Sequence, residues 1–150
     1  MKGAAAMATE KKSNKRVLVV DDEPDFAVLA TSILKDGGYK ASIALSAEEA
    51  MARVESQSPD LVTLDLQMPG HSGLLFYREL KKRPAYRDLP VVVISGFAGN
   101  DLDREKFIKH FLEPDHIPHP DAYLDKPLGQ DDFLRAVGNI LDSTGERSSE

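Results

Sequence analysis

The sequence predicts an α/β domain in which a doubly wound parallel sheet is covered by helices on both faces. Three short apolar runs, at Val17–Val20, Leu61–Leu64 and Val91–Ile94, do not alternate with polar residues. Near-continuous β-branched runs are typical of strands buried on both faces, as in a parallel sheet between helices. Segments with helical spacing lie between the runs, so strand and helix alternate along the chain.

Two weaker segments, Lys40 to Leu45 and Ala122–Leu124, complete a set of five predicted strands. A chain of 150 residues is within the range of one domain and can bury a core without disulfides or a structural metal. The pattern is therefore a strand followed by a helix, repeated five times.

The five predicted helices follow these strands in turn. Gly37 and Gly38 end the first helix, and Ser46 with Glu49 forms a capping-box signature at the start of the second. Pro84 follows the third helix and stops it. The predicted helical segments are Phe26–Leu34, 46–54, Leu74–Lys82, Leu102–Leu112 and Phe133–Leu141.

The chain is predicted to divide into a disordered leader at 1–15, one folded domain at 16–141 and a flexible polar tail at 142–150. The leader has no apolar core of signal-peptide length, and no stretch of the chain approaches a membrane span. We therefore expect a protein without a membrane segment.

Charge and composition exclude several classes of function. The chain has 19 Lys and Arg against 25 Asp and Glu, a net charge of −6. The first sixteen residues carry five basic side chains and one acidic one, so the remainder carries −10. DNA affinity comes largely from Lys and Arg, so no direct DNA binding is expected. The absence of cysteine excludes disulfide frameworks, thiolate metal sites and thiol nucleophiles, and it fits a cytoplasmic location.

Chemically active residues stand where the predicted strands end. Asp21 and Asp22 follow the first strand, Asp65 the third, Ser95 the fourth, and Lys126 the fifth by a residue or two. The carboxyl ends of parallel strands lie on one edge of the sheet, where such folds bind their ligands. These residues are therefore expected to converge on one crevice.

The residue types in this crevice favour phosphoryl transfer to a carboxylate. Crowded carboxylates either have raised pKa values or bind a compensating cation, and oxygen-only ligands select Mg²⁺ or Mn²⁺ before zinc. The ammonium of Lys126 and the hydroxyl of Ser95 suit an arriving anion. Asp65 is the expected nucleophile, since carboxylates form acyl phosphates in other systems.

Four motifs in this order resemble those of the receiver domains of two-component response regulators. The resemblance covers about residues 16–141 and rests on Val17-Leu-Val-Val-Asp-Asp-Glu-Pro24, Asp65-Leu-Gln-Met-Pro-Gly70 with Gly73, Val93-Ile-Ser-Gly96 and Asp125-Lys-Pro127. It implies a flavodoxin-like, five-stranded parallel sheet in the strand order 2-1-3-4-5.

The resemblance also implies roles at the site. Asp65 would accept phosphate, and it would ligate Mg²⁺ (or Mn²⁺) together with Asp22 and the backbone carbonyl of Gln67. Asp21 would act mainly through metal-bound water, and Lys126 would contact the phosphate.

A second implied device is a conformational switch. Ser95 would move toward the phosphate after transfer, and Tyr123, three residues before the lysine, would fill the space that is left. Gln67 and Phe97 would flank the phosphoryl group. Because a bulky Phe97 would hinder the attacking water, slow loss of phosphate is expected.

The implied partners are proteins. The phosphoryl donor would be a sensor histidine kinase or a histidine phosphotransfer protein, and the phosphorylated domain would control a downstream protein target. The chain would be a phosphoacceptor that assists its own phosphorylation and dephosphorylation, not an enzyme. A monomer or a weak dimer is expected.

Other interpretations remain open at the level of sequence. Singly, the motifs could be helix caps, turns or surface residues. Together, they could belong to a receiver-like interaction module that does not use phosphorylation. A haloacid-dehalogenase-type phosphatase would need an acid where Gln67 stands, and no G-x-G-x-x-G or Walker motif supports a nucleotide- or flavin-binding domain.

One segment departs from the family pattern. The interval from Ser95 to Lys126 is longer than usual, and the excess falls in the Pro- and His-containing residues 113–121. A zinc or nickel site that uses His110, His116 and His119 is an alternative to a solvated loop there. A partner-specific contact is the preferred functional interpretation of this loop.

Overall fold

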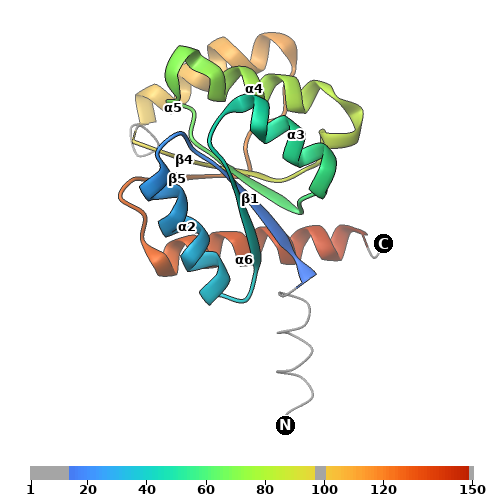
Figure 1. Ribbon diagram of the computed structural model, residues 1–150. Helices are drawn as coiled ribbons and strands as arrows, with labels where there is room; N and C mark the ends of the chain where they lie inside the picture. The colour runs from blue at the N-terminus through green and yellow to red at the C-terminus, as the bar shows by residue number, and fades with distance from the viewer. Residues whose placement is uncertain (1–13, 97–100, 149–150) are drawn as a thin grey trace.

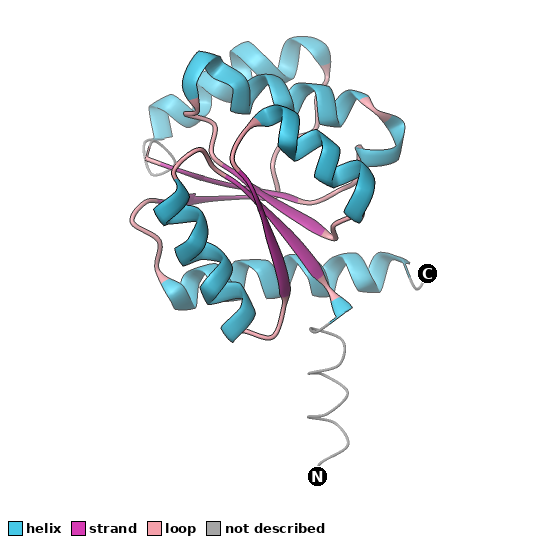
Figure 2. Ribbon diagram, viewed as in Figure 1, coloured by secondary structure: helices cyan, strands magenta, loops and turns pink. Residues whose placement is uncertain are grey.

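The structure, a computed structural model, describes residues 14–96 and 101–148. Five strands form one parallel sheet in the order β2-β1-β3-β4-β5, with helices on both faces (Figures 1 and 2). This confirms the predicted fold class, including the strand order. The expected leader lies almost entirely outside the described residues.

The strands occur where the apolar runs predicted them. Each is four or five residues long, and the order along the chain alternates with helices: β1 (Arg16–Val20), β2 (Lys40–Ala44), β3 (Leu61–Leu64), β4 (Val91–Ser95) and β5 (Ala122–Asp125). All carboxyl ends therefore lie on one edge of the sheet, because every neighbouring pair is parallel.

One group of helices covers one face of the sheet, and a second group covers the other (Figure 1). The first group is α2 (Pro24–Asp36) and α6 (Gln130–Ser148), and the second is α3 (Ala47–Gln57), α4 (Ser72–Lys82) and α5 (Asp101–Phe107). In the part of the chain described by the structure, no helix is both long enough and apolar enough to cross a membrane.

Successive residues of a strand point into two separate hydrophobic cores, because side chains alternate between the two faces of a sheet. Leu18 and Val20 of β1 pack with α3 and α4, whereas Val17 and Val19 pack with α2 and α6. All four side chains are almost completely buried. Both faces of the central strands are therefore apolar, which explains why their sequences do not alternate.

Two features of the helices differ from the prediction. The last helix continues to Ser148, past the predicted end at Leu141. Leu29 and Phe111 are apolar residues of the predicted helical segments Phe26–Leu34 and Leu102–Leu112, yet they are 49% and 40% exposed. Apolar spacing alone does not distinguish a side chain on the edge of a buried stripe from one in its centre.

The segment 113–121 is mostly exposed, with two buried points of attachment at Ile117 and Pro120. It follows α5 and a π-helical turn (Ile108–Leu112), and it begins with a 3-10 turn (Glu113–Asp115). The hydroxyl of Tyr77 on α4 donates to the carbonyl of Pro118 at 2.5 Å, and Ile117 is 5% exposed. The segment enters β5 at the edge of the sheet opposite the carboxyl ends.

A buried lysine holds the connection between α4 and β4. Lys81 is 3% exposed, and its ammonium donates to the backbone carbonyls of Tyr86, Arg87 and Leu89. Burial lowers the pKa of Lys81 to about 8. The carbonyl acceptors compensate for the removal of the charge from water.

Gly73 allows α4 to begin directly against the end of β3. A Cβ atom at this position would lie 2.2 Å from the backbone carbonyl oxygen of Asp65 and 3.0 Å from Cα of Leu66. Backbone atoms cannot yield as a flexible side chain can. The missing side chain is therefore what sets the distance between this helix and the Asp65 backbone.

We predict that Gly73→Ala lowers the melting temperature by about 3–8 °C, because overpacking against backbone costs about 1–3 kcal/mol. Thermal unfolding followed by circular dichroism measures this. Gly138→Ala in α6 is the matched control, since its Cβ would meet the Tyr39 hydroxyl oxygen at an ordinary 3.6 Å. Equal melting temperatures for the Gly73 variant and the wild type would contradict the prediction.

Candidate functional site

Four acidic side chains gather at the carboxyl ends of β1 and β3. One carboxylate oxygen from each of Asp21, Asp22, Glu23 and Asp65 lies within 4.8 Å of the other three. Asp21 and Asp65 are 1% and 3% exposed, Asp22 is half-buried and Glu23 is exposed. The structure thus brings together the three aspartates that the sequence singled out, and it adds Glu23 to them.

Lys126, the residue directly after β5, contacts this cluster from the far side of β4. Its ammonium nitrogen lies 2.9 Å from Oδ2 of Asp21, 3.3 Å from Oδ2 of Asp65 and 3.4 Å from Oε1 of Glu23. Partial burial by itself would lower the pKa of Lys126, but its contacts with Asp21 and Asp65 outweigh burial and raise this pKa. Lys126 is therefore held as a cation.

One lysine does not balance the charge of four carboxylates. Burial raises the pKa of Asp21, and the neighbouring charge of Asp65 adds to this shift. Oδ2 of Asp21 is buried and accepts no hydrogen bond of normal geometry, although the ammonium of Lys126 is close. A buried, under-coordinated carboxylate oxygen beside three other carboxylates fits a small divalent cation with oxygen ligands.

Backbone N–H groups fix one oxygen of each buried aspartate. The N–H of Glu23 donates to Oδ1 of Asp21, and the N–H of Gln67 donates to Oδ1 of Asp65, both at 2.9 Å. Each carboxylate is therefore locked at one oxygen by the residue two positions later in the chain. The other oxygen, Oδ2, faces the ammonium in both cases.

Phe26 forms an apolar wall for Lys126 that the sequence did not reveal. The ammonium nitrogen lies 4.4 Å from the centre of the Phe26 ring. A cation over an aromatic face is stabilised by the ring quadrupole. The sequence predicts Phe26 only as the start of a helical segment, because helical spacing carries no information about a partner that follows β5.

Ser95 and Tyr123 lie on the same face of neighbouring strands. Val93 pairs with Tyr123, and Ser95 is two residues beyond Val93, so both side chains point toward the face covered by α3, α4 and α5. The hydroxyls of both residues are buried and have no hydrogen-bond partner. Burial raises the pKa of Tyr123 to about 12, and the guanidinium of Arg104 packs 4.9 Å from the ring centre.

The remaining predicted residues have different outcomes. The Gln67 side chain is exposed, and its backbone N–H is the group that contacts Asp65. Phe97 lies outside the described residues. The acidic cluster is the one group of metal-ligating side chains found in the described ranges, so the zinc or nickel alternative that uses His110, His116 and His119 has no support.

Comparison with known proteins gives a consistent family. The pattern of the response regulator receiver domain matches residues 17–138. Protein Rrf1 of Nitratidesulfovibrio vulgaris (strain Hildenborough) is 38% identical over 126 residues, which cover 84% of this chain and 82% of Rrf1. The phosphate regulon transcriptional regulatory protein PhoB of Escherichia coli K12 is 27% identical, and the match covers 85% of this chain and 52% of PhoB. The chain thus spans about half the length of PhoB.

Solved structures agree on the fold. The response regulator receiver domain protein (CheY-like) from Methanospirillum hungatei JF-1 superposes with a TM-score of 0.72 at 24% identity. The match covers 89% of this chain and 98% of that one. The described sheet order, the acidic edge of the sheet and these matches lead to one conclusion: the chain belongs to the response regulator receiver domain family, the phosphoacceptors of two-component signal transduction.

Proposed function

We propose that Asp65 is the aspartate that accepts the phosphoryl group, with Mg²⁺ bound by the acidic cluster beside it. The observation that carries this proposal is the position of the Asp65 carboxylate. It is 3% exposed, within 4.8 Å of three other acidic groups, and 3.3 Å from the Lys126 ammonium. Asp21 shares these features, and Asp65 is distinguished from it by its place after β3 in the motif Asp65-Leu-Gln-Met-Pro-Gly70.

The proposed metal ligands are oxygens of Asp22 and Asp65 with the backbone carbonyl of Gln67, and Asp21 acts through metal-bound water. Glu23 extends this acidic set on its exposed side. When bound, Mg²⁺ supplies positive charge to the transferring phosphoryl oxygens. Mn²⁺ fits the same oxygen ligands. The raised pKa of Asp21 supports the need for a cation, because burial and like charge both disfavour its ionised form.

In the proposed transfer, a carboxylate oxygen of Asp65 attacks the phosphorus of a donor phosphohistidine. The new O–P bond forms as the N–P bond breaks, and the histidine ring keeps that electron pair. The N–H of Gln67 holds Oδ1 of Asp65 in place, which orients Oδ2 toward Lys126. Lys126 then stabilises the negative charge that gathers on the phosphoryl oxygens.

Ser95 and Tyr123 are proposed to transmit the change. The Ser95 hydroxyl has no partner before transfer, so a new phosphoryl oxygen offers it a hydrogen bond. Movement of Ser95 would free space on the face that Tyr123 shares with it. Phosphate shifts this equilibrium only to the extent that it interacts better with the rearranged state.

The proposal also names the partners of the domain and its place in the cell. The donor is a sensor histidine kinase or a histidine phosphotransfer protein, and the target is a downstream protein, not DNA. The domain assists its own phosphorylation and dephosphorylation and works in the cytoplasm as a monomer or weak dimer. Residues 16–141 are proposed as the functional unit.

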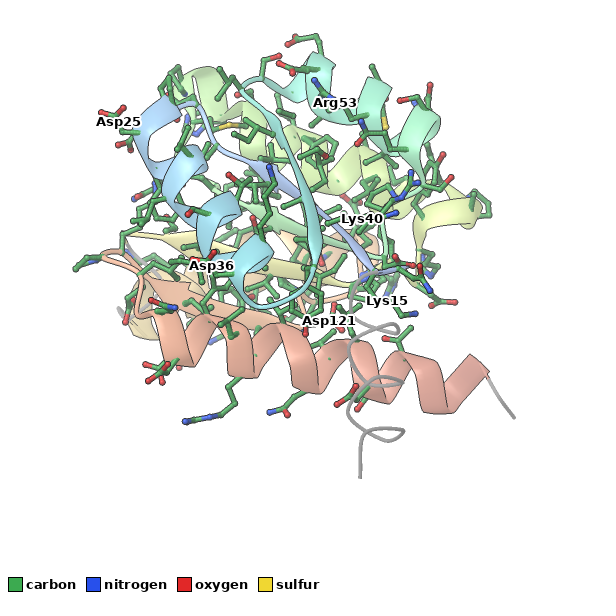
Figure 3. All side chains as sticks on the ribbon, turned by 60° about the horizontal axis from the view of Figure 1, so that its bottom comes forward. Lys15, Asp25, Asp36, Lys40, Arg53 and Asp121 are labelled. Carbon is green, nitrogen blue, oxygen red and sulfur yellow. The ribbon has the colours of Figure 1, made fainter. Side chains whose placement is uncertain are left out.

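Acetyl phosphate should label the wild-type protein at one site in the presence of Mg²⁺, and Asp65→Asn should abolish the label. Intact-mass spectrometry measures the added phosphoryl group. Asp36→Asn is the matched control, because Asp36 is the last residue of the 13-residue helix α2, whose first turn follows the cluster residues Asp21, Asp22 and Glu23. Figure 3 labels Asp25 in the first turn of α2 and Asp36 at its end. Full labelling of the Asp65 variant, or labelling that persists in excess chelator, would reject the proposal.

Without metal, Asp21→Asn should raise the melting temperature at pH 7 by about 2–5 °C. The pKa of Asp21 is raised in the folded protein, so its ionised form opposes folding at neutral pH. This penalty disappears as the pH falls through the raised pKa, and the gain from Asn should therefore shrink toward pH 4.

A Mg²⁺ titration separates this electrostatic effect from metal binding. Mg²⁺ should raise the melting temperature of the wild type, because it binds the folded state, and it should raise that of Asp21→Asn much less. Asp36→Asn again serves as the control. A variant that is less stable than the wild type in chelator at pH 7 would contradict the prediction.

A further inference from the structure

A groove of about 490 Å³ lies beside the acidic site, between the connection from β3 to α4 and the end of α5. The groove is defined by its apolar lining, which consists of Leu66, Met68, Leu74, Phe107 and Phe111. The proposed phosphoryl transfer uses none of these five side chains. The volume is enough for one or two large apolar side chains.

The aromatic wall of the groove combines a rigid base with an exposed ring. Phe107 is 5% exposed and packs edge-on against Tyr77 of α4, with 6.3 Å between ring centres. Phe111, one turn further on, lies 6.3 Å from Phe107 and is 40% exposed. An aromatic side chain that is held in place from beneath and open above is a typical anchor for a partner.

The polar lining of the groove is basic or neutral, although the chain as a whole carries −6. Lys106 comes from α5 and His71 from the connection between β3 and α4, and among the lining side chains that the structure describes Gln67 is the one other with nitrogen or oxygen atoms. No Asp or Glu side chain lines the groove within 14–96 and 104–144, where the structure describes the side chains. An acidic protein with an apolar groove between a lysine and a histidine is complementary to an apolar segment with negative flanks.

We propose that this groove binds a peptide segment of a protein partner, in which a side chain the size of Leu or Phe stands between Asp or Glu residues. The apolar side chain fills the space beside Phe111, and a flanking carboxylate pairs with Lys106.

The groove is also connected to Asp65, and this part of the inference rests on the proposed function. Gln67 lines the groove, and its backbone N–H donates to Oδ1 of Asp65 at 2.9 Å. Leu66 is the residue between them in the chain. Phosphorylation of Asp65 changes the carboxylate that orients this loop, so the phosphorylated protein should bind the segment with a different affinity.

The test is selection from a phage-displayed library of random twelve-residue peptides, followed by fluorescence anisotropy with the enriched peptide. Enriched peptides should carry a large apolar residue flanked by at least two acidic ones. Phe111→Ala and Lys106→Glu should each weaken binding by about fivefold or more. Lys109→Glu is the matched control, because Lys109 is exposed and does not line the groove, and it should change the affinity by less than about twofold.

Several outcomes would overturn the inference. These are no enrichment, enriched peptides that lack acidic residues, or affinities that Phe111→Ala and Lys106→Glu leave unchanged. A concentration-dependent dimer that Phe111→Ala abolishes in sedimentation would show that a second copy occupies the groove, and would also reject the peptide partner.

Acetyl phosphate labelling of the same samples separates this inference from the proposed function. If Asp65 is labelled normally but Phe111→Ala and Lys106→Glu leave the peptide affinity unchanged, the proposed peptide site is rejected and the phosphoacceptor role of Asp65 is not. If the wild type is not labelled, the phosphoacceptor role of Asp65 is rejected. The peptides selected by the unlabelled protein still test whether the groove binds an apolar segment with acidic flanks. Equal affinity with and without phosphate rejects the coupling between the two.

Discussion

The structure depends on the ion pairs by which one lysine partly neutralises a crowded set of carboxylates. Asp21 and Asp65 are almost completely buried at adjacent strand ends, where their charges repel each other and are poorly hydrated. Lys126, from the opposite side of β4, brings its ammonium within 3.3 Å of both. The pair with Asp21 joins residues 105 positions apart and the pair with Asp65 joins residues 61 apart. Both pairs therefore form only when β1, β3, β4 and β5 are assembled in the correct order.

The other residues of the site hold these carboxylates and the Lys126 ammonium in position. Gly73 lets α4 begin against the Asp65 backbone, and the N–H of Gln67 fixes one oxygen of that carboxylate. The Phe26 ring restricts where the Lys126 ammonium can lie. The negative charge that Lys126 leaves unbalanced contributes to the raised pKa of Asp21, and in the proposed function Mg²⁺ would offset this charge. Membership of the receiver family leaves the phosphatase and flavin-binding alternatives without support.

Much of this was accessible from the sequence, because the relevant signals are local. The buried runs at β1, β3 and β4 do not alternate, which identifies a parallel sheet, and Ser46 accepts a hydrogen bond from the N–H of Glu49 as its capping motif predicts. Asp21, Asp65 and Lys126 stand directly after strands or close to their ends. Parallel topology alone then requires that they meet at one edge.

Only the tertiary structure decided what surrounds these residues. Lys81 stands at the end of a helix, where a lysine is expected to be solvated. The α4–β4 connection instead folds over it, and its ammonium donates hydrogen bonds to three backbone carbonyls. Glu23, Phe26 and the groove beside Phe111 likewise depend on contacts between distant segments. A sequence determines its strands, helices and their polar ends through local patterns of spacing, whereas burial, charge pairing and open surface depend on which faces the assembled chain brings together.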